Sequence, residues 1–215
     1  KVTVEGISTL QSQDIAYAEE LGYRIKLLGM TRRHENGIEL RVHPALIPAR
    51  RLIANVEGAM NAVLIKGDAV GATLYYGPGA GSEPTASAII ADLVDVTRLF
   101  TADPEHRVPS LAFQYESLAD TPILPMSEVK TATYMRLRVA DESGVLADIT
   151  RILADSHISI DALLQKQAED GSSETDLIIL THVVKEGAVN AAIARMQMLR
   201  TVKSKVVRLR MEELS

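Results

Sequence analysis

The sequence predicts an α+β protein: an antiparallel sheet with helices on one face, followed by a unit of strand, helix, strand, strand, helix and strand. Alternating apolar stretches typical of strands occur in both halves, glycines separate one strand from a long helix, and a proline-bearing segment divides the halves. We expect residues 1–100 to form a first domain, residues 101–131 to be a linker or extended arm, and residues 132–215 to form a second domain.

Elements of both types are expected in the first half. Residues 1–7 are β-prone, and residues 13–21 carry apolar side chains at helical spacing, with Gly22 as a plausible helix stop. Strand character then recurs at residues 23–31, 38–42, 61–66 and 72–76. A turn at Glu35-Asn36-Gly37 is expected between the first two, because Asn-Gly tolerates positive φ. The prolines of residues 43–48 indicate irregular chain.

The second half has a clearer pattern. Strands are expected at residues 133–140, 158–167, 176–184 and 202–211, with helices at 144–156 and 187–199 and a turn at 169–173. This order over roughly eighty residues is typical of the ferredoxin-like unit. Both helices should therefore lie on one face of a four-stranded antiparallel sheet.

Composition limits the possible functions. The chain of 215 residues is 47% hydrophobic, has a net charge of −5, and contains 4% aromatic residues without tryptophan. These values disfavour a nucleic-acid or membrane partner, and no apolar run reaches the roughly 18 residues of a spanning helix. The absence of cysteine excludes disulfides and fits a reducing, cytoplasmic location. The five scattered histidines have no metal-ligand spacing, so we predict no metal site.

A glycine loop precedes the long helix of the first half. Gly77, Gly79 and Gly81 occur within five residues, and glycine alone enters positive φ without steric cost. Ser82 can cap the helix, and Pro84 suits its first turn. Without a Cβ at residues 79 and 81, a ligand could approach the backbone and the positive end of the helix dipole. The alternative is a plain turn, since the spacing differs from the dinucleotide-binding G-x-G-x-x-G.

Several stretches, taken in order, resemble one enzyme family. Residues 43–48 (HPALIP), 61–63 (NAV), 67–68 (GD) and 76–88 (YGPGAGSEPTASA) resemble the substrate domain of homoserine dehydrogenase. Residues 141–149 (DESGVLADI) resemble an ACT domain, which many bacterial homoserine dehydrogenases carry at the C-terminus. Arg50-Arg51 departs from the pattern, since close relatives are expected to have a histidine there.

The resemblance implies interconversion of L-homoserine and L-aspartate 4-semialdehyde with NAD or NADP, in threonine, methionine and isoleucine biosynthesis. It also implies a nucleotide-binding N-terminal domain and a catalytic Asp and Lys in a D-x-x-x-K helix, neither of which occurs here. We therefore expect a piece of a longer protein that is inactive alone and has no catalytic residue of its own. Lys26 is interpreted as a strand lysine and His43 as a structural histidine.

The resemblance also assigns the glycine loop to the cofactor. In the family, the backbone at the last glycine approaches the nicotinamide, which carries this role to Gly81, with Gly79 beside it. Hydride transfer needs the two reacting atoms within about 3–3.5 Å, so a side chain on the loop would obstruct it. The choice between NAD and NADP stays open, because the residue that decides it would lie in the missing domain.

The start of the first helix in the second domain is the candidate effector site, with Asp141, Ser143, Gly144 and Val145 as its residues. An amino acid's carboxylate suits a helix N-terminus, and Asp141 could take the ammonium group. The resemblance suggests threonine as the effector. The alternative is that Asp141 or Ser143 only caps the helix.

The resemblance implies a homo-oligomer, a dimer or tetramer, formed through the substrate-domain sheet and the ACT domains. Effector sites of ACT domains usually lie between paired copies. A stand-alone amino-acid-binding or oligomerisation module without catalysis is the alternative function. The glycine loop disfavours it, since a sensor has no use for such a loop.

Overall fold

The computed structural model describes residues 2–103, 113–166 and 172–214, and the chain divides into two compact units. The larger unit contains residues 1–54 and 122–214, and the smaller contains residues 55–121. This division does not coincide with the boundaries expected at residues 100 and 131, because the first 54 residues fold together with the second half. The α+β class is confirmed.

The larger unit is built on one eight-stranded sheet. Its strands are β1 (Thr3–Val4), β2 (Tyr23–His34), β3 (Gly37–Pro48), β6 (Lys130–Ala140), β7 (Ile160–Gln165), β8 (Glu174–Thr181), β9 (Val184–Lys185) and β10 (Val207–Met211). The main path is β1-β3-β10-β6-β8-β7, with β2 paired to β3 and β9 to β6. Its helical elements are α1 (Ser12–Glu20), α3 (Val145–Asp155), α4 (Glu186–Gln197) and the short η4 (Met126–Glu128). A further short helix, η1 (Leu52–Asn55), ends at the unit boundary.

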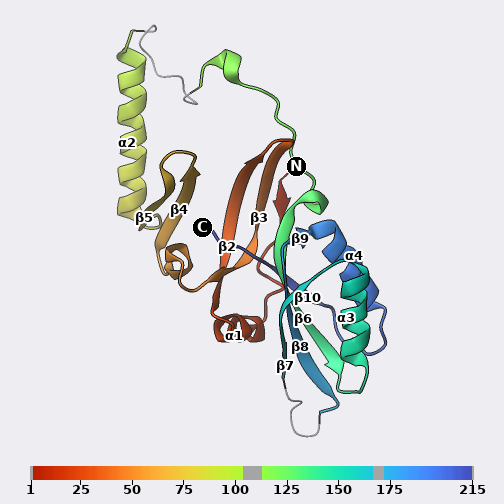
Figure 1. The fold of residues 1–215 in the computed structure, drawn as a ribbon. Helices are drawn as coiled ribbons and strands as arrows, with labels where there is room; N and C mark the ends of the chain where they lie inside the picture. Colours follow the sequence, from red (N-terminus) through yellow and green to blue (C-terminus); the bar gives the residue numbers. More distant parts are fainter. Residues whose placement is uncertain (1, 104–112, 167–171, 215) are drawn as a thin grey trace. The chain divides into compact units, whose positions relative to one another are not determined.

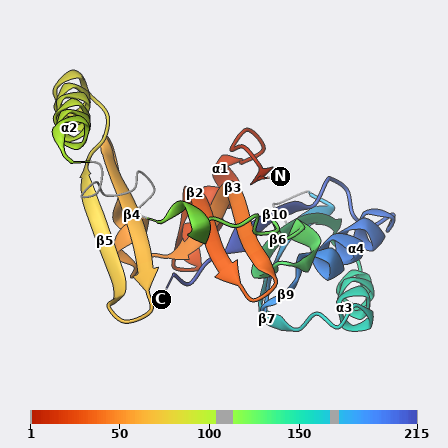
Figure 2. The ribbon, with the colours of Figure 1, turned by 90° about the horizontal axis from the view of Figure 1, so that it is seen from above.

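The strand and helix order predicted for the second half is confirmed. β6, β7, β8 and β10 are antiparallel neighbours in the order β10-β6-β8-β7. Helices α3 and α4 pack side by side on one face of this sheet (Figures 1 and 2). Their apolar faces meet alternate residues of β6 and β8 in one core, which includes Leu137, Ile149, Leu177 and Val189. The apolar spacing of both helices therefore matches the sides that they bury.

Several predicted bounds differ from the structure. The third strand of this half ends at Thr181, and Val184 begins the short β9. The last strand begins at Val207 rather than at residue 202. Here the α4 side chain of Gln197 accepts a hydrogen bond from the backbone N–H of Val206 (3.0 Å). It also donates to the carbonyl oxygen of Ser204 (3.1 Å). Before this point the chain touches β6 briefly, through an isolated bridge between Val202 and Val139 and a hydrogen bond from the Lys203 N–H to the Arg138 carbonyl (2.8 Å). The predicted turn at 169–173 and the end of the strand at 167 lie largely outside the described residues.

Helix α1 covers the opposite face of the same sheet (Figure 1). Its buried Ala18 and half-buried Tyr17 pack in a second core with Tyr134, Ile178 and Leu209 from the strands. The helix ends as predicted at Gly22, whose φ is +80°. The sheet of the second half is therefore covered on both faces, on one of them by a helix from the first half.

Strands β1, β2 and β3 of the first half share one sheet with the strands of the second half, whereas β4 and β5 form a separate two-stranded sheet. Strand β10 pairs with β3 in parallel, with Arg210 opposite Ala45 and Met211 opposite Leu46. The backbone N–H of Glu212 extends this pairing by donating to the Leu46 carbonyl (2.9 Å). β1 also pairs with β3 in parallel, so the sheet is mixed rather than purely antiparallel.

The hairpin of β2 and β3 confirms the turn expected at Glu35-Asn36-Gly37 and corrects one prediction. His34 pairs with Gly37, so the two-residue loop is Glu35-Asn36, one position earlier than the Asn-Gly pair. Residues 43–48 are not irregular but continue β3. Proline disfavours helix before it and not strand, and Pro44 falls between the positions where β1 and β10 pair with β3.

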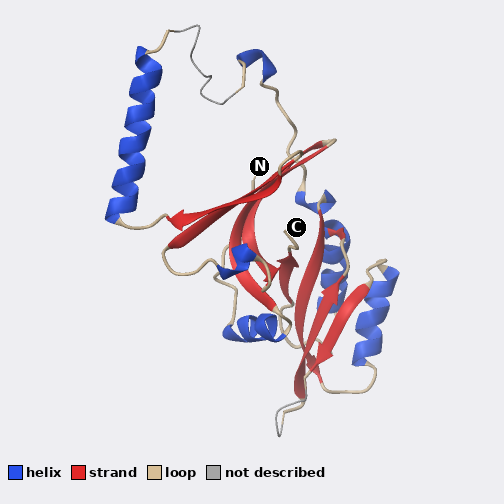
Figure 3. Cartoon of the chain, turned by 60° about the vertical axis from the view of Figure 1, so that its left-hand side comes forward, coloured by secondary structure: helices blue, strands red, loops and turns tan. Residues whose placement is uncertain are grey.

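The smaller unit holds a hairpin and one long helix. Its elements are β4 (Met60–Gly67), β5 (Gly71–Pro78), α2 (Ser82–Thr101) and the short η3 (Tyr115–Ser117). The hairpin and helix were both predicted, and Figure 3 shows α2 as a single continuous helix. No residue of α2 is buried, and its apolar Ile90, Leu93 and Val96 are more than half exposed. Among the helices of the described residues, none is long and apolar enough to cross a membrane.

Candidate functional site

The glycine loop joins β5 to α2 in the smaller unit. Gly81 is the N-cap residue of α2, with φ +120° and ψ 156°, so Ser82 is the first helical residue and not the cap. The hydroxyl of Thr85 donates to the Gly81 carbonyl (2.7 Å), and no side chain caps the helix start. Only glycine adopts the Gly81 conformation without strain.

Gly79 has a packing reason to lack a side chain. A Cβ at this position would lie 2.3 Å from Nδ2 and 2.9 Å from Cγ of Asn61, on the paired strand β4. The Gly79 N–H donates to the Ala59 carbonyl (3.3 Å), which holds the loop against the start of that strand. Both candidate cofactor residues are thus required by the loop's own geometry.

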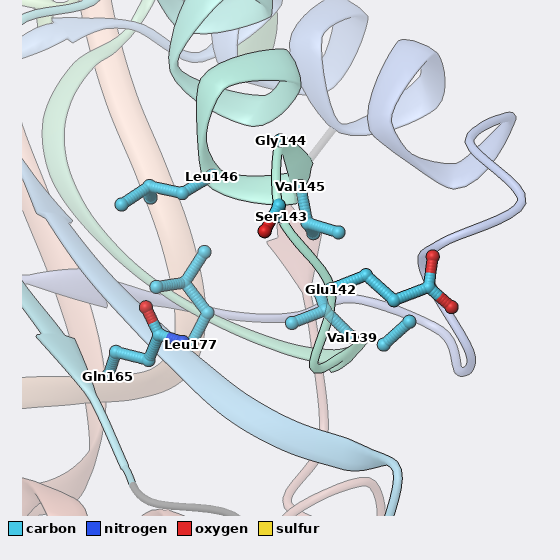
Figure 4. Close-up of a pocket in the computed structure, with 9 residues that line it drawn as sticks. Val139, Glu142, Ser143, Gly144, Val145, Leu146, Gln165 and Leu177 are labelled. Atoms are coloured by element: carbon cyan, nitrogen blue, oxygen red, sulfur yellow. The ribbon is translucent and has the colours of Figure 1, made fainter.

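The second candidate site is a pocket of about 220 Å³ in the larger unit. It is lined by Val139, Ala140, Glu142, Ser143, Gly144, Val145, Leu146, Gln165 and Leu177. Figure 4 shows the Ser143 hydroxyl facing the space between Leu146 and Leu177, whereas the Glu142 carboxylate turns away from it. Three of the four predicted effector residues therefore meet here.

Asp141 is the predicted residue that does not line the pocket. It lies at the exposed end of β6, where its backbone N–H donates to the Ser173 carbonyl (2.9 Å). The role of its carboxylate in taking an ammonium group stays a prediction.

The pocket lies at the N-terminus of α3. Gly144 is the N-cap residue in the left-handed conformation, with φ +93°, and no side chain caps the helix. The alternative reading, in which Asp141 or Ser143 serves as the cap, is therefore wrong. The first-turn N–H groups of Val145 and its successors have no partner within the helix, and they carry the positive end of its dipole.

The sequence did not predict the strand residues that line the pocket, such as Gln165 and Leu177. Gln165 on β7 pairs with Leu177 on β8, and Leu177 pairs with Leu137 on β6, so three strands contribute to one site. Residues far apart in the sequence become neighbours here only through strand order. The predicted ferredoxin-like order was the one signal that could have placed them together.

His43 has the surroundings of a structural histidine. It is fully buried in β3, where Arg41 Nη1 donates to its Nε2 (2.8 Å). Its Nδ1 must then carry the proton and donate to the Pro44 carbonyl (3.0 Å). Burial lowers the His43 pKa, which keeps the ring neutral. Lys26 lies within β2, opposite Ala45, as a strand residue.

Fold and pocket define a chain whose second half is an ACT domain. Residues 133–197 match the family model of the ACT domain, and residues 1–94 match that of homoserine dehydrogenase. The chain belongs to the homoserine dehydrogenase family.

The similar proteins agree over the whole chain. A homoserine dehydrogenase from Pseudomonas aeruginosa is 54% identical over 100% of this chain and 50% of its own length. One from Neisseria gonorrhoeae is 52% identical over 98% of this chain and 48% of its own length. The crystal structure of a homoserine dehydrogenase from Thiobacillus denitrificans is 69% identical, with a TM-score of 0.91 over 100% of this chain and 48% of that one. The chain thus spans about half the length of the relatives it matches.

Proposed function

We propose that this chain is the C-terminal half of an NAD(P)-dependent homoserine dehydrogenase, which interconverts L-homoserine and L-aspartate 4-semialdehyde. The observation that carries the proposal is the match to homoserine dehydrogenases over all of the chain, at 54% identity in the P. aeruginosa protein. The catalytic Asp and Lys of the family are expected outside these 215 residues. This half then supplies part of the cofactor site and a regulatory domain.

The glycine loop is the part we assign to the cofactor, NAD or NADP, whose nicotinamide exchanges a hydride with the substrate. Gly81 has no side chain, and no side chain caps the start of α2, which fits this role. A free helix N-terminus also favours negatively charged groups such as a dinucleotide's phosphates. The loop's task is to leave room for the ring while another domain holds it.

The pocket at α3 is the part we assign to an amino-acid effector, with threonine as the candidate. Its volume of about 220 Å³ suits a small metabolite, since pockets for drug-sized ligands span roughly 300–1,000 Å³. The uncapped N–H groups of α3 suit the carboxylate. The Ser143 hydroxyl and the Gln165 amide are polar groups available on an otherwise apolar wall.

A coupled assay on the product of the complete reading frame tests the activity. We expect homoserine-dependent reduction of NAD or NADP, and no turnover by the 215-residue chain alone. A complete protein that oxidises other hydroxy amino acids but not homoserine would contradict the proposal.

Calorimetry of threonine with the 215-residue chain tests the effector. We expect binding that is weakened by Gly144→Ala, because the new Cβ lies at the pocket and strains a left-handed residue. Gly22→Ala is the matched control, since Gly22 also has positive φ and open space around it but does not line the pocket. Absence of heat in the unchanged chain, or equal weakening by both variants, would count against the site.

The proposal includes a cytoplasmic homo-oligomer, a dimer or tetramer, formed through the hairpin unit and the ACT domain. Exposed apolar side chains on α2 and on the β4-β5 hairpin, such as Val63 and Tyr75, support an interface in the smaller unit. Sedimentation of the 215-residue chain tests it: a dimer or larger species is expected, and a monomer at every concentration would contradict it.

A further inference from the structure

Two strands of the ACT sheet each face the pocket on one side and α1 on the other. On β6, Val139 lines the pocket, while Arg136 projects to the opposite face. On β8, Leu177 lines the pocket, and its neighbour Asp176 projects to the opposite face. The side chains that meet α1 are therefore one to three residues, roughly 3–10 Å of strand, away from the pocket wall.

Arg136 holds the start of α1 through a buried carboxylate. Its Nε donates to Asp14 Oδ1 (2.6 Å), and its Nη2 donates to Asp14 Oδ2 (3.2 Å) and to Gln11 Oε1 (2.6 Å). The Tyr134 hydroxyl lies 3.4 Å from the same carboxylate, which also accepts from the Gln11 backbone N–H (3.1 Å). Asp14 is fully buried, so water cannot replace these hydrogen bonds without a large loss of stability.

Asp176 holds the middle of α1 by a second bond. The Tyr17 hydroxyl donates to Asp176 Oδ2 (2.9 Å), while Arg138 of β6 lies 3.4 Å from Oδ1. Tyr17 thus contacts the strand pair whose other face forms the pocket. A shift of β6 against β8 has to move α1 with it or break bonds that are buried or half-buried.

We propose that α1 relays occupancy of the ACT pocket to residues 1–54, through the Arg136–Asp14 and Asp176–Tyr17 contacts. The inference rests on the proposed function, because it takes threonine as the ligand of the pocket. Helix α1 leads directly through Gly22 into β2, and both belong to the segment that matches homoserine dehydrogenase. Threonine can shift α1 only if it binds more tightly when the helix is in one position than in another. Binding should therefore change how well the backbone amides of α1 are protected from hydrogen exchange.

Hydrogen exchange of the 215-residue chain, with and without threonine, measures this directly. We expect threonine to slow exchange at the amides of residues 12–20 by several-fold. In Tyr17→Phe and Asp14→Asn chains, calorimetry should find threonine affinity within about threefold of the unchanged chain, with the change in α1 exchange reduced or lost. Tyr17→Phe removes one hydroxyl and keeps the ring, so it stands in if Asp14→Asn does not fold.

Asp155→Asn is the matched control. It removes a carboxylate that pairs with Arg195 (2.9 Å) on the other face of the sheet and does not contact α1. This variant should keep the full response of α1. In the complete protein, Tyr17→Phe should retain basal activity while threonine inhibits it less.

The outcomes separate the two claims. A chain that binds no threonine would overturn both the effector assignment and the relay. A chain that binds threonine while the exchange of residues 12–20 stays unchanged would overturn the relay alone. The relay would also fall if Tyr17→Phe and Asp155→Asn altered the response of α1 equally.

Discussion

Arg210 on the last strand donates two hydrogen bonds to Glu5, close to the start of the chain: Nη1 to Oε2 (2.9 Å) and Nη2 to Oε1 (2.8 Å). The same guanidinium contacts Glu186, the first residue of α4, with Nη2 2.9 Å from Oε2. Arg210 and Glu186 are buried, so the carboxylates neutralise a cation that water cannot reach. Three elements from opposite ends of the sequence thus meet at one side chain.

The first prediction concerns acid stability. The hydrogen bond and charge of Arg210 lower the pKa of Glu5 from its ordinary 4.5 to about 2. A depressed pKa adds stability that is complete above pH 4.5 and disappears as the pH falls toward 2. In urea unfolding between pH 5 and 2, the free energy of unfolding should therefore fall more steeply for the unchanged chain than for Glu5→Gln. Parallel curves for the two proteins would contradict this.

The second prediction concerns Asp14 as a structural group. Asp14→Ala leaves Arg136 buried without its carboxylate and should lower the free energy of unfolding by about 3–5 kcal/mol. Glu20→Ala on the same helix is the control, because it breaks the exposed pair with Lys166 and should cost about 0–1 kcal/mol. Urea denaturation of the 215-residue chain measures both. Similar losses in the two variants would refute the assignment of Asp14 to a buried network.

The third prediction concerns the cofactor loop in the complete protein. Gly81→Val should raise the cofactor KM or lower kcat, because a side chain would occupy the space assigned to the nicotinamide. Gly71→Val is the control: Gly71 has φ +77° and lies at the other end of the hairpin, so it reproduces the backbone strain. Steady-state kinetics compare the two. If both variants lose activity equally, backbone strain alone explains the effect of Gly81→Val. If Gly81→Val leaves the kinetics unchanged, the loop is not part of the active site.

The fourth prediction separates core from pocket on α3. Ile149 is fully buried between the sheet and α4, so Ile149→Ala should cost about 2–5 kcal/mol of unfolding free energy. Leu146 is 37% exposed and lines the pocket, so Leu146→Ala should cost clearly less while weakening threonine binding. Thermal unfolding and calorimetry on both variants check this. The reverse ranking of stabilities would show that the helix is rotated from its described position.

The sequence predicted those elements that depend on local pattern. The spacing of Val145, Ile149, Ile152 and Leu153 is a property of one helix, and all four are buried. Hairpin β4-β5 likewise depends on neighbouring strands. The β3–β10 pairing joins residues about 165 positions apart, and no periodicity within either strand indicates it.

The same limit applies to the candidate sites: the sequence indicated residues that are close together in the chain and not those that the fold brings together. Ser143 and Gly144 follow from the chemistry of a helix start, which is visible in a few consecutive residues. Gln165 and Leu177 could be placed only by strand order. The docking of α1 escaped sequence reasoning because it depends on polar residues, Asp14 and Arg136, whose burial an apolar pattern does not predict.

The parallel pairing of β10 with β3 bears on any attempt to remove the proposed regulatory domain by cutting the chain. A polypeptide that stops before residue 122 would lose the strand residues that α1 packs against and would leave the backbone of β3 open at residues 45–46. Open strand edges recruit other strands, so such a protein should precipitate rather than run unregulated. Point substitutions at the pocket are therefore the sounder way to remove the proposed effector site while the sheet stays intact.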